Sequence, residues 1–294
     1  MLTRRRFNLV AGGVAGWMLV GRRAVAAAVA PRLVENLAQF EAKSGGRLGV
    51  AVIDTGDGSL TQHRGDERFP MCSTFKVLAA AAVLKKAGED LAGLQQRLRF
   101  DKSDLVDYSP VTSEHTGGDG MTMAEFCEAA ITRSDNTAGN MLLKNIGGPE
   151  GLTAFARSLG DEVTRLDRIE TELNEAKAGD VRDTTSPNAM AANLRKLVLG
   201  DALLPAARDQ LIAWMVANKT GDARLRAGLP RGWRVGDKTG SGAHGSSNDV
   251  AVVWPEGRAP VIVASYLTET SGSDDQRNAA HAAIGRAVAA AIAG

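Results

Sequence analysis

The chain has 294 residues, of which 44% are hydrophobic and only 4% aromatic, and its formal net charge is +1. This length suits one compact unit or two closely joined lobes, with a core built mainly from Ala, Leu, Val and Ile. The balanced charge offers no basic patch for nucleic acid, and the four histidines stand singly, without the close pairing that metal sites use. We therefore expect neither a nucleic-acid partner nor a metal site.

The first residues predict an export signal. Three arginines, Arg4 to Arg6, precede an apolar stretch over 9–20, and small residues around Ala26 offer a cleavage site. We predict a signal peptide over 1–26 whose arginines resemble the twin-arginine type, with an ordinary secretory signal as the alternative. Its removal takes away five arginines and leaves a formal charge of −4. No other segment is apolar enough to span a bilayer, so we expect a periplasmic protein without stable membrane association.

After the signal, apolar periodicity predicts a helix over 33–43 and a strand over 47–54. An almost wholly helical stretch follows, with helices expected over 75–86, 122–132, 137–146, 151–159, 187–199 and 205–216. Strand character returns at 233–238, 250–254 and 260–267, and a closing amphipathic helix covers 276–292.

This order predicts an α/β fold with an inserted helical domain. The simplest packing pairs the two ends of the chain in one antiparallel sheet. It assigns 27–65 and 222–294 to an α/β domain and 66–221 to an all-α domain. One segment of the all-α domain, 165–185, is polar and nearly aperiodic, and loops of this length in compact regions are usually functional or disordered.

Ser73 and Lys76 form the first candidate for chemistry. They precede the apolar run over 77–84, so a helix is expected to start close to the serine and to place both side chains on one face. A helix N-terminus also directs free N–H groups at whatever the serine attacks. A lysine with a lowered pKa can remove the serine proton, but Ser-x-x-Lys alone also occurs by chance.

Three further clusters lie at plausible positions. Ser134-Asp135-Asn136 falls between two predicted helices, where an ordinary helix N-cap is the simpler interpretation. The run 238–242, Lys-Thr-Gly-Ser-Gly, ends a predicted strand and could be a plain turn. The run 168–174 brings Arg, Glu and Asn side chains into the long loop, where solvated charge is the alternative. Their joint appearance in one exported chain favours a catalytic site.

Ser-x-x-Lys, Ser-Asp-Asn and Lys-Thr-Gly are together the motif set of the class A serine β-lactamases, and the chain resembles this family over essentially all of its mature length. Supporting stretches at 108–112, 146–149, 182–185 and 248–249 are also similar to the family. The resemblance implies a five-stranded antiparallel sheet flanked by helices beside the all-α domain. It also implies a small-molecule β-lactam substrate, no cofactor and a monomer.

The resemblance implies roles in acylation for several residues. Ser73 would attack the lactam carbonyl, and the backbone N–H groups of Ser73 and Ser241 would form the oxyanion hole. Ser134 would pass a proton to the departing lactam nitrogen. Either Lys76 or Glu170 would be the base that activates Ser73, and the sequence leaves this choice open.

The remaining matched residues are implied in release of the acyl group and in substrate binding. Glu170 and Asn174 would activate the water that frees the acyl group, and Arg168 would pair with Asp183 to anchor the loop 165–185. The residues implied in substrate binding are Tyr108, Asn136, Arg224, Lys238, Thr239, Gly240 and Ser241.

The chain departs from the family pattern at several positions. Thr171 follows Glu170 where many relatives have a proline after a cis bond. The sequence therefore leaves open whether the Glu170–Thr171 bond is cis or trans. Ser247 stands where many relatives carry an arginine, and Arg224 resembles an alternative arginine for the same pocket.

The two cysteines also depart from it. Cys127 and Cys72 each match one half of a disulfide found in some relatives, but the partner positions hold Ala80 and Gly242. We therefore expect two free thiols. Cys72, Ser241 and Gly242 together resemble the broad-spectrum, cephalosporin-hydrolysing branch of the family.

Other functions remain as alternatives. A penicillin-binding D,D-peptidase, or a β-lactam sensor that binds without hydrolysis, would share the serine, lysine and Lys-Thr-Gly elements. Glu170 and Asn174 argue against both, because a deacylating carboxylate on a long loop indicates turnover.

Overall fold

A five-stranded antiparallel sheet forms the centre of the protein. The computed structural model describes residues 33–293, so the predicted signal peptide lies outside the described residues. The strands run in the order β2-β1-β9-β8-β7. They are β1 (Arg47–Asp54), β2 (Leu60–His63), β7 (Arg234–Ser241), β8 (Ser247–Trp254) and β9 (Val261–Thr268). The first strand of the sequence thus pairs with the last, with Ala51 opposite Ala264, and the predicted fold class is confirmed.

Two features of the sheet differ from the sequence-based strands. The pattern gave no strand at β2, whose four residues alternate between exposed and half-buried at the edge of the sheet and include only one large apolar side chain, Leu60. The strand expected to end at Lys238 continues to Ser241, because pairing with β8 holds the small residues Thr239 to Ser241 extended, with Ser241 opposite Ser247.

Helices account for most of the remaining chain. Their bounds are α2 (Phe75–Lys86), α3 (Met123–Thr132), α4 (Asn136–Ile146), α5 (Gly148–Ser158), α6 (Pro187–Val198), α7 (Pro205–Val216), α8 (Leu225–Gly228) and α9 (Asp274–Ala293). A further helix covers 33–44. Two small antiparallel pairs join distant segments: β3 (Phe69–Pro70) with β6 (Thr184–Thr185), and β4 (Arg97–Leu98) with β5 (Met121–Thr122).

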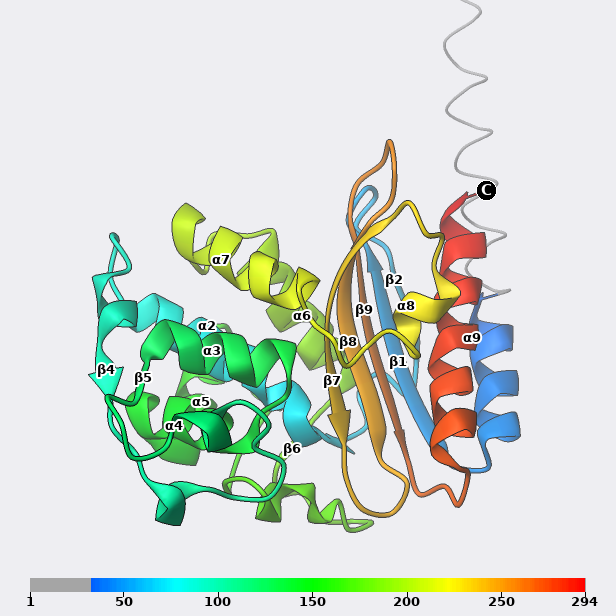
Figure 1. Cartoon of the computed structure of the whole chain (residues 1–294). Coiled ribbons are helices and arrows are strands. Elements are labelled where there is room, and N and C mark those ends of the chain that lie inside the picture. The colour runs from blue at the N-terminus through cyan, green and yellow to red at the C-terminus, as the bar shows by residue number, and fades with distance from the viewer. Residues whose placement is uncertain (1–32, 294) are drawn as a thin grey trace, which may run out of the picture.

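The sheet is covered on both faces. Helices α2 to α7 lie on one side, and α9 with the helix 33–44 lies on the other (Figure 1). Since side chains alternate across a strand, Val250 and Val252 of β8 join the core under α2 to α7, whereas Ala251 and Val253 join the core under α9. Each face of the sheet therefore has its own apolar core.

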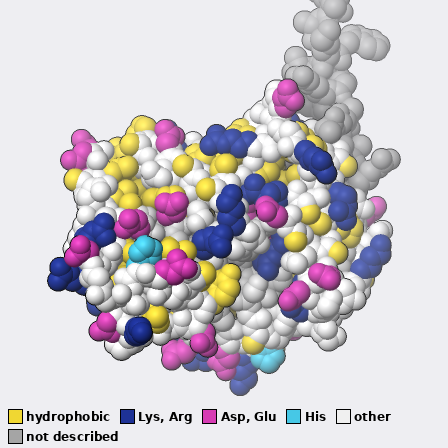
Figure 2. All heavy atoms as spheres, viewed as in Figure 1, with side chains coloured by type: hydrophobic (Ala, Val, Ile, Leu, Met, Phe, Trp, Pro, Cys, Tyr) yellow, Lys and Arg dark blue, Asp and Glu magenta, His cyan; other side chains and the backbone are white. Residues whose placement is uncertain are grey.

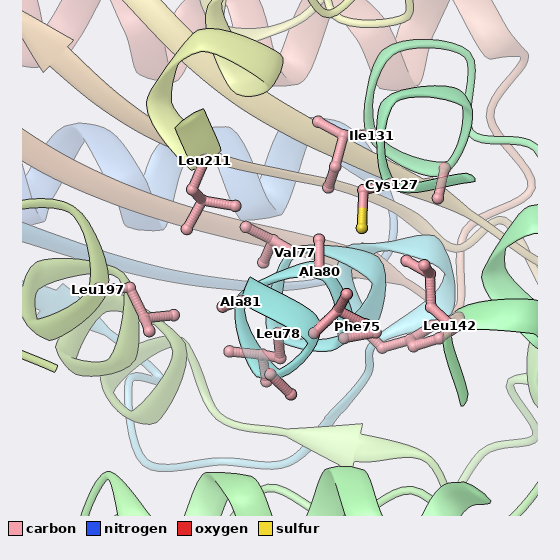
Figure 3. Packing of buried hydrophobic residues seen from close by; sticks show 14 of the residues in the cluster. Phe75, Val77, Leu78, Ala80, Ala81, Cys127, Ile131, Leu142, Leu197 and Leu211 are labelled. Atoms are coloured by element: carbon pink, nitrogen blue, oxygen red, sulfur yellow. The ribbon is translucent and has the colours of Figure 1, made fainter. Parts of the chain in front are cut away.

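Helix α2 is the hub of the helical side. All its residues from Phe75 to Leu84 are buried, so it has no solvent face. Figure 3 shows it surrounded by Ile131 of α3, Leu142 of α4, Leu197 of α6 and Leu211 of α7. A helix that is apolar all round must be buried, and its four consecutive alanines let neighbouring helices approach closely. This packing fixes the N-terminal end of α2, where Ser73 lies.

Candidate active site

Ser73 sits at the start of α2. It belongs to a short 3₁₀ turn, Cys72–Thr74, that runs directly into the helix, so Lys76 lies one turn further on. The Lys76 Nζ donates a hydrogen bond of 2.9 Å to the Ser73 Oγ. The shared face predicted from the spacing is therefore present.

Lys76 joins three separate segments of the chain. Its Nζ donates to the Ser134 backbone oxygen at 2.8 Å and to the Asn136 Oδ1 at 2.6 Å. It also lies 2.9 Å from the Glu170 Oε1, and both of these side chains are wholly buried. The Glu170 Oε1 in turn accepts a hydrogen bond from the Ser73 Oγ at 3.1 Å. Serine, lysine and glutamate thus form a closed triangle of contacts.

Burial sets the electrostatics of the two site lysines. Removal from water lowers the pKa of Lys76, opposed by the nearby Glu170 carboxylate. Burial lowers the pKa of Lys238 still further, and the positive charge of Lys76 acts in the same direction. Each ammonium group therefore loses its proton more readily than that of a lysine in water.

Ser134 lies between the two lysines. The Lys238 Nζ donates to the Ser134 Oγ at 2.9 Å and to the Thr239 backbone oxygen at 2.7 Å. Ser134 itself has a left-handed backbone (φ 58°) in the short connection between α3 and α4. Asp135 is the N-cap of α4, as the simpler interpretation held, and accepts from the Ala138 N–H at 2.8 Å. The cap thereby orients its two neighbours toward the lysines.

A pair of asparagines holds Glu170. The Asn174 Nδ2 donates to the Glu170 Oε2, which leaves Oε1 for Ser73 and Lys76. Asn140 of α4 accepts from the Glu170 N–H and donates to the Glu170 carbonyl, both at 2.9 Å. The Glu170–Thr171 peptide bond between these contacts is cis, which answers the question that the sequence left open.

Sequence reasoning missed Asn140. It lies one helical turn after Asn136, on the face of α4 that turns toward the loop 165–185. The available signal was a second asparagine on that face, one turn after Asn136. That signal is weak, because the sequence alone does not show which loop faces this side of α4.

The loop 165–185 is anchored at its neck. The Asp183 carboxylate accepts from the Asp167 and Arg168 N–H groups at 2.8 and 2.9 Å. It also pairs with the Arg168 guanidinium, with Nε to Oδ2 at 2.6 Å. Asp183 is only 1% exposed, so these contacts lie largely out of water. Charge-assisted bonds of this kind are among the stronger ones in proteins.

Arg224 lies beside the end of β7. Its guanidinium donates to the Gly240 and Asn248 backbone oxygens at 2.8 and 2.6 Å, and to the Ser241 Oγ at 2.7 Å. The Nε donates to the Asn278 Oδ1 of α9 at 3.1 Å. Arg224 thus reaches the strand that carries Lys238, from a segment next to α8.

Gly240 lets that strand approach the serine. A Cβ at this position would lie 2.8 Å from the Met71 oxygen and 3.2 Å from the Ser73 nitrogen. Only glycine allows β7 to pack this closely against the 3₁₀ turn, which places Ser241 next to the backbone of Ser73. Thr239, one residue earlier, is held by Thr220, with the two hydroxyl oxygens 2.6 Å apart.

Tyr108 marks the mouth of the site. Its side chain is 61% exposed, although its backbone oxygen accepts from the Asn136 N–H at 3.0 Å. The Asn136 Nδ2 donates to the Asp107 oxygen at 2.8 Å and has a second hydrogen for another partner.

Both cysteines are free and buried, in agreement with the expectation from the sequence. A Cβ on Gly242 would lie 2.7 Å from the Cys72 Sγ, so glycine leaves room for the thiol there. Figure 3 places Cys127 across from Ala80 of α2. Within the described residues, no group of three or more His, Cys, Asp or Glu side chains is placed to hold a metal ion.

The fold and these contacts define a class of enzyme. A serine hydroxyl at a helix start touches a buried lysine and a carboxylate, and a second lysine–serine pair faces it across the site. This is the arrangement of a serine enzyme that works by acyl transfer.

Comparisons with known proteins give the family. Residues 32–292 match the model of the β-lactamase enzyme family. The chain is 52% identical to β-lactamase Toho-1 from Escherichia coli over 254 residues, which cover 86% of this chain and 87% of that protein.

Solved structures agree with this match. An ancestral class A β-lactamase is 64% identical, with a TM-score of 0.86 over 88% of this chain and 99% of the other. A putative class A β-lactamase from Rhodopseudomonas palustris is 62% identical, with a TM-score of 0.87 over the same shares. The chain belongs to the class A β-lactamases.

Proposed function

We propose that this protein hydrolyses the β-lactam ring of penicillins and cephalosporins through an acyl-enzyme on Ser73, and so gives resistance to these antibiotics. The observation that carries the proposal is the position of Glu170. Its Oε1 lies 3.1 Å from the Ser73 Oγ and 2.9 Å from the Lys76 Nζ, while Asn174 holds its second oxygen. A carboxylate at the nucleophile gives the enzyme a means to release the acyl group.

Acylation begins with loss of the Ser73 proton. Lys76 and Glu170 both lie within hydrogen-bond distance of the Ser73 Oγ, so each meets the geometric requirement for the base. Burial favours the neutral amine of Lys76, which supports its role as a proton acceptor. The alkoxide then attacks the lactam carbonyl and the C–N bond of the ring breaks.

Two groups assist this step. The backbone N–H groups of Ser73 and Ser241 would stabilise the oxyanion, a contribution of roughly 3 kcal/mol for a single donor in other enzymes. Ser134 would give its proton to the departing lactam nitrogen. Its Oγ accepts from the Lys238 Nζ at 2.9 Å, so Lys238 can supply a replacement proton.

The substrate carboxylate would bind at the end of β7. Lys238, Thr239 and Ser241 offer a cation and two hydroxyls, and Arg224 donates to the Ser241 Oγ at 2.7 Å. The free hydrogen of the Asn136 amide would bind the acylamido side chain. Tyr108, exposed at the mouth, would contact the same part of the substrate.

Deacylation would use a water molecule held by Glu170 and Asn174 beside the acyl carbon on Ser73. Glu170 would remove a proton from this water as it attacks and pass that proton to the Ser73 Oγ, 3.1 Å from the Glu170 Oε1, which would leave as the hydroxyl. The contacts of Asn140, Arg168 and Asp183 support this role, because they fix the loop that carries the carboxylate.

The alternatives predict a different time course. A D,D-peptidase or a β-lactam sensor would stop after one acylation, whereas the proposed hydrolase turns over many times. Mixing the purified protein with excess chromogenic cephalosporin separates the two. A single burst equal to the active-site concentration would refute the proposal.

We further propose that the chain is exported to the periplasm by the twin-arginine route, loses residues 1–26, and acts as a monomer. The Arg4-Arg5-Arg6 run before the apolar stretch supports this route. No helix in the described part of the chain is long and apolar enough to cross a membrane. On the face in Figure 2, basic and acidic side chains are interspersed, which supports a small-molecule partner over nucleic acid.

The same proposal divides the mature chain into an α/β domain, 27–65 with 222–294, and an all-α domain, 66–221. The helices α2 to α7, all within 66–221, lie on one face of the sheet, and α9 with the helix 33–44 lies on the other, which supports this division (Figure 1).

A further inference from the structure

A cavity that the proposed reaction does not use lies on the other face of the sheet. It has a volume of about 790 Å³ and lies between the helix 33–44 and α9. Figure 1 shows these two helices side by side on the face away from α2. This volume falls within the range of cavities that bind small organic molecules.

The cavity follows from the spacing of small residues along α9. Its lining residues Gln276, Ala280, Ala283 and Ala287 are separated by four, three and four positions, so they share one face of the helix. This face extends for about 16 Å along the axis. Because three of the four are alanine, α9 leaves open space that larger side chains would fill.

The opposite wall is equally regular. Asn36, Phe40 and Ser44 line the cavity at intervals of four residues, which places them on one face of the helix 33–44. Leu267 at the end of β9 adds a further apolar contact. The walls therefore form an elongated groove whose apolar part consists of Phe40, Leu267 and the alanines of α9, with polar side chains such as Asn36 and Ser44 beside them.

All charged residues that line the groove are basic. They are Lys43, Arg277 and Arg286. Arg277 pairs with Asp274 and donates to the Gly272 oxygen, so its charge is already balanced. Lys43 and Arg286 are exposed, and within residues 33–293 neither forms a salt bridge. They are free to bind an acidic group.

Two of the neutral polar groups that line the groove are engaged within the protein. The Thr270 Oγ1 donates to the Ser44 oxygen at 2.6 Å, and the Gln276 Oε1 accepts from the Ser273 N–H at 2.8 Å. For an acidic head group, Lys43 and Arg286 offer the charge that these neutral groups lack.

We propose that this groove binds an amphipathic organic anion, with an alkyl or aromatic body against Phe40 and the alanines of α9, and an acidic group at Lys43 and Arg286. The complementarity is twofold: the apolar stretch from Ala280 to Ala287, about 10 Å long, suits a hydrocarbon body, and the unpaired cations Lys43 and Arg286, one on each wall, suit a negative charge. Binding here is separate from β-lactam hydrolysis, because the sheet lies between the groove and Ser73.

Two fluorescent probes of nearly the same shape test this proposal. 8-Anilinonaphthalene-1-sulfonate carries the anionic group, and N-phenyl-1-naphthylamine lacks it. We expect saturable one-to-one binding of the sulfonate by the purified protein. The double variant Lys43→Gln with Arg286→Gln raises its Kd about tenfold and leaves the Kd of the neutral probe unchanged. The matched control, Lys144→Gln with Arg195→Gln, removes the same charges from the helical side and changes neither Kd.

A second pair of variants tests the place of binding. Ala283→Trp fills the groove and abolishes binding of both probes, while turnover of a chromogenic cephalosporin stays unchanged. If Ala283→Trp does not fold, Ala279→Leu replaces it in the test. This variant changes an exposed position on the same wall and weakens the binding of both probes. Displacement of the sulfonate by benzylpenicillin, equal affinity in the Lys43/Arg286 variant, or the absence of saturable binding would each overturn the proposal.

Discussion

Removal of the Asn140 side chain tests how the protein holds Glu170, the proposed deacylating carboxylate. This amide makes two hydrogen bonds of 2.9 Å, one to each side of the Glu170 backbone, at a partly buried position. At about 0.5–1.5 kcal/mol for each bond, Asn140→Ala costs about 1–3 kcal/mol of stability. A loss of about 2 kcal/mol lowers the Tm by about 4–8 °C for a protein of this size.

The effect on catalysis is larger for one step than for the other. The contacts between Ser73 and Lys76 lie within one helix start and do not need Asn140, so acylation largely persists. A shift of about 1 Å in Glu170 slows deacylation by about 100-fold. Stopped-flow acylation by benzylpenicillin, followed by mass spectrometry of the intact protein, separates the two rates.

A graded control sharpens this test. Asn140→Asp keeps the oxygen that accepts from the Glu170 N–H and loses the donor to the Glu170 carbonyl, so its stability and deacylation rate fall between the other two. If Asn140→Ala deacylated at the wild-type rate with an unchanged Tm, the idea that this amide positions Glu170 would be refuted.

Two further predictions concern the half-buried Arg224 and the buried His281. Arg224→Ala raises the KM for penicillins about tenfold or more, with a smaller change in kcat, because in the proposed reaction Arg224 orients Ser241 for the substrate carboxylate. Steady-state kinetics beside the exposed control Arg195→Ala measures this, and an unchanged KM contradicts it. Burial lowers the pKa of His281 to about 3, so the unfolded chain binds a proton that the folded protein does not. Stability from His281 is thus fully present above pH 6.5 and falls by up to about 5 kcal/mol toward pH 3. Denaturant unfolding of wild type and His281→Gln across this range tests it, and parallel curves would exclude the effect.

Much of the fold follows from local patterns. Helix α2 and strand β1 have the bounds that periodicity predicted, since each is a long buried run with a clear start and end. Strand β2 escaped prediction because a short edge strand needs few apolar residues. The extension of β7 through Ser241 depends on pairing with β8, which no local pattern within the run 238–242 reveals.

The candidate site divides in a similar way. Ser73 and Lys76 are neighbours on one turn, so their contact could be predicted from spacing alone. The contact of Glu170 with both depends on the path of an irregular loop, and only the family resemblance suggested it. Asn140 shows the limit of both approaches, because its role depends on two backbone groups of that loop and on no motif.

The most direct test of the account is the fate of the acyl-enzyme in Glu170→Ala. In the proposed mechanism Glu170, at 3.1 Å from the Ser73 Oγ, releases the acyl group. After exposure to benzylpenicillin, mass spectrometry of this variant should show one persistent adduct on Ser73, while the wild-type protein returns to its free mass. Rapid steady-state hydrolysis by Glu170→Ala, with no accumulated adduct, would contradict the account.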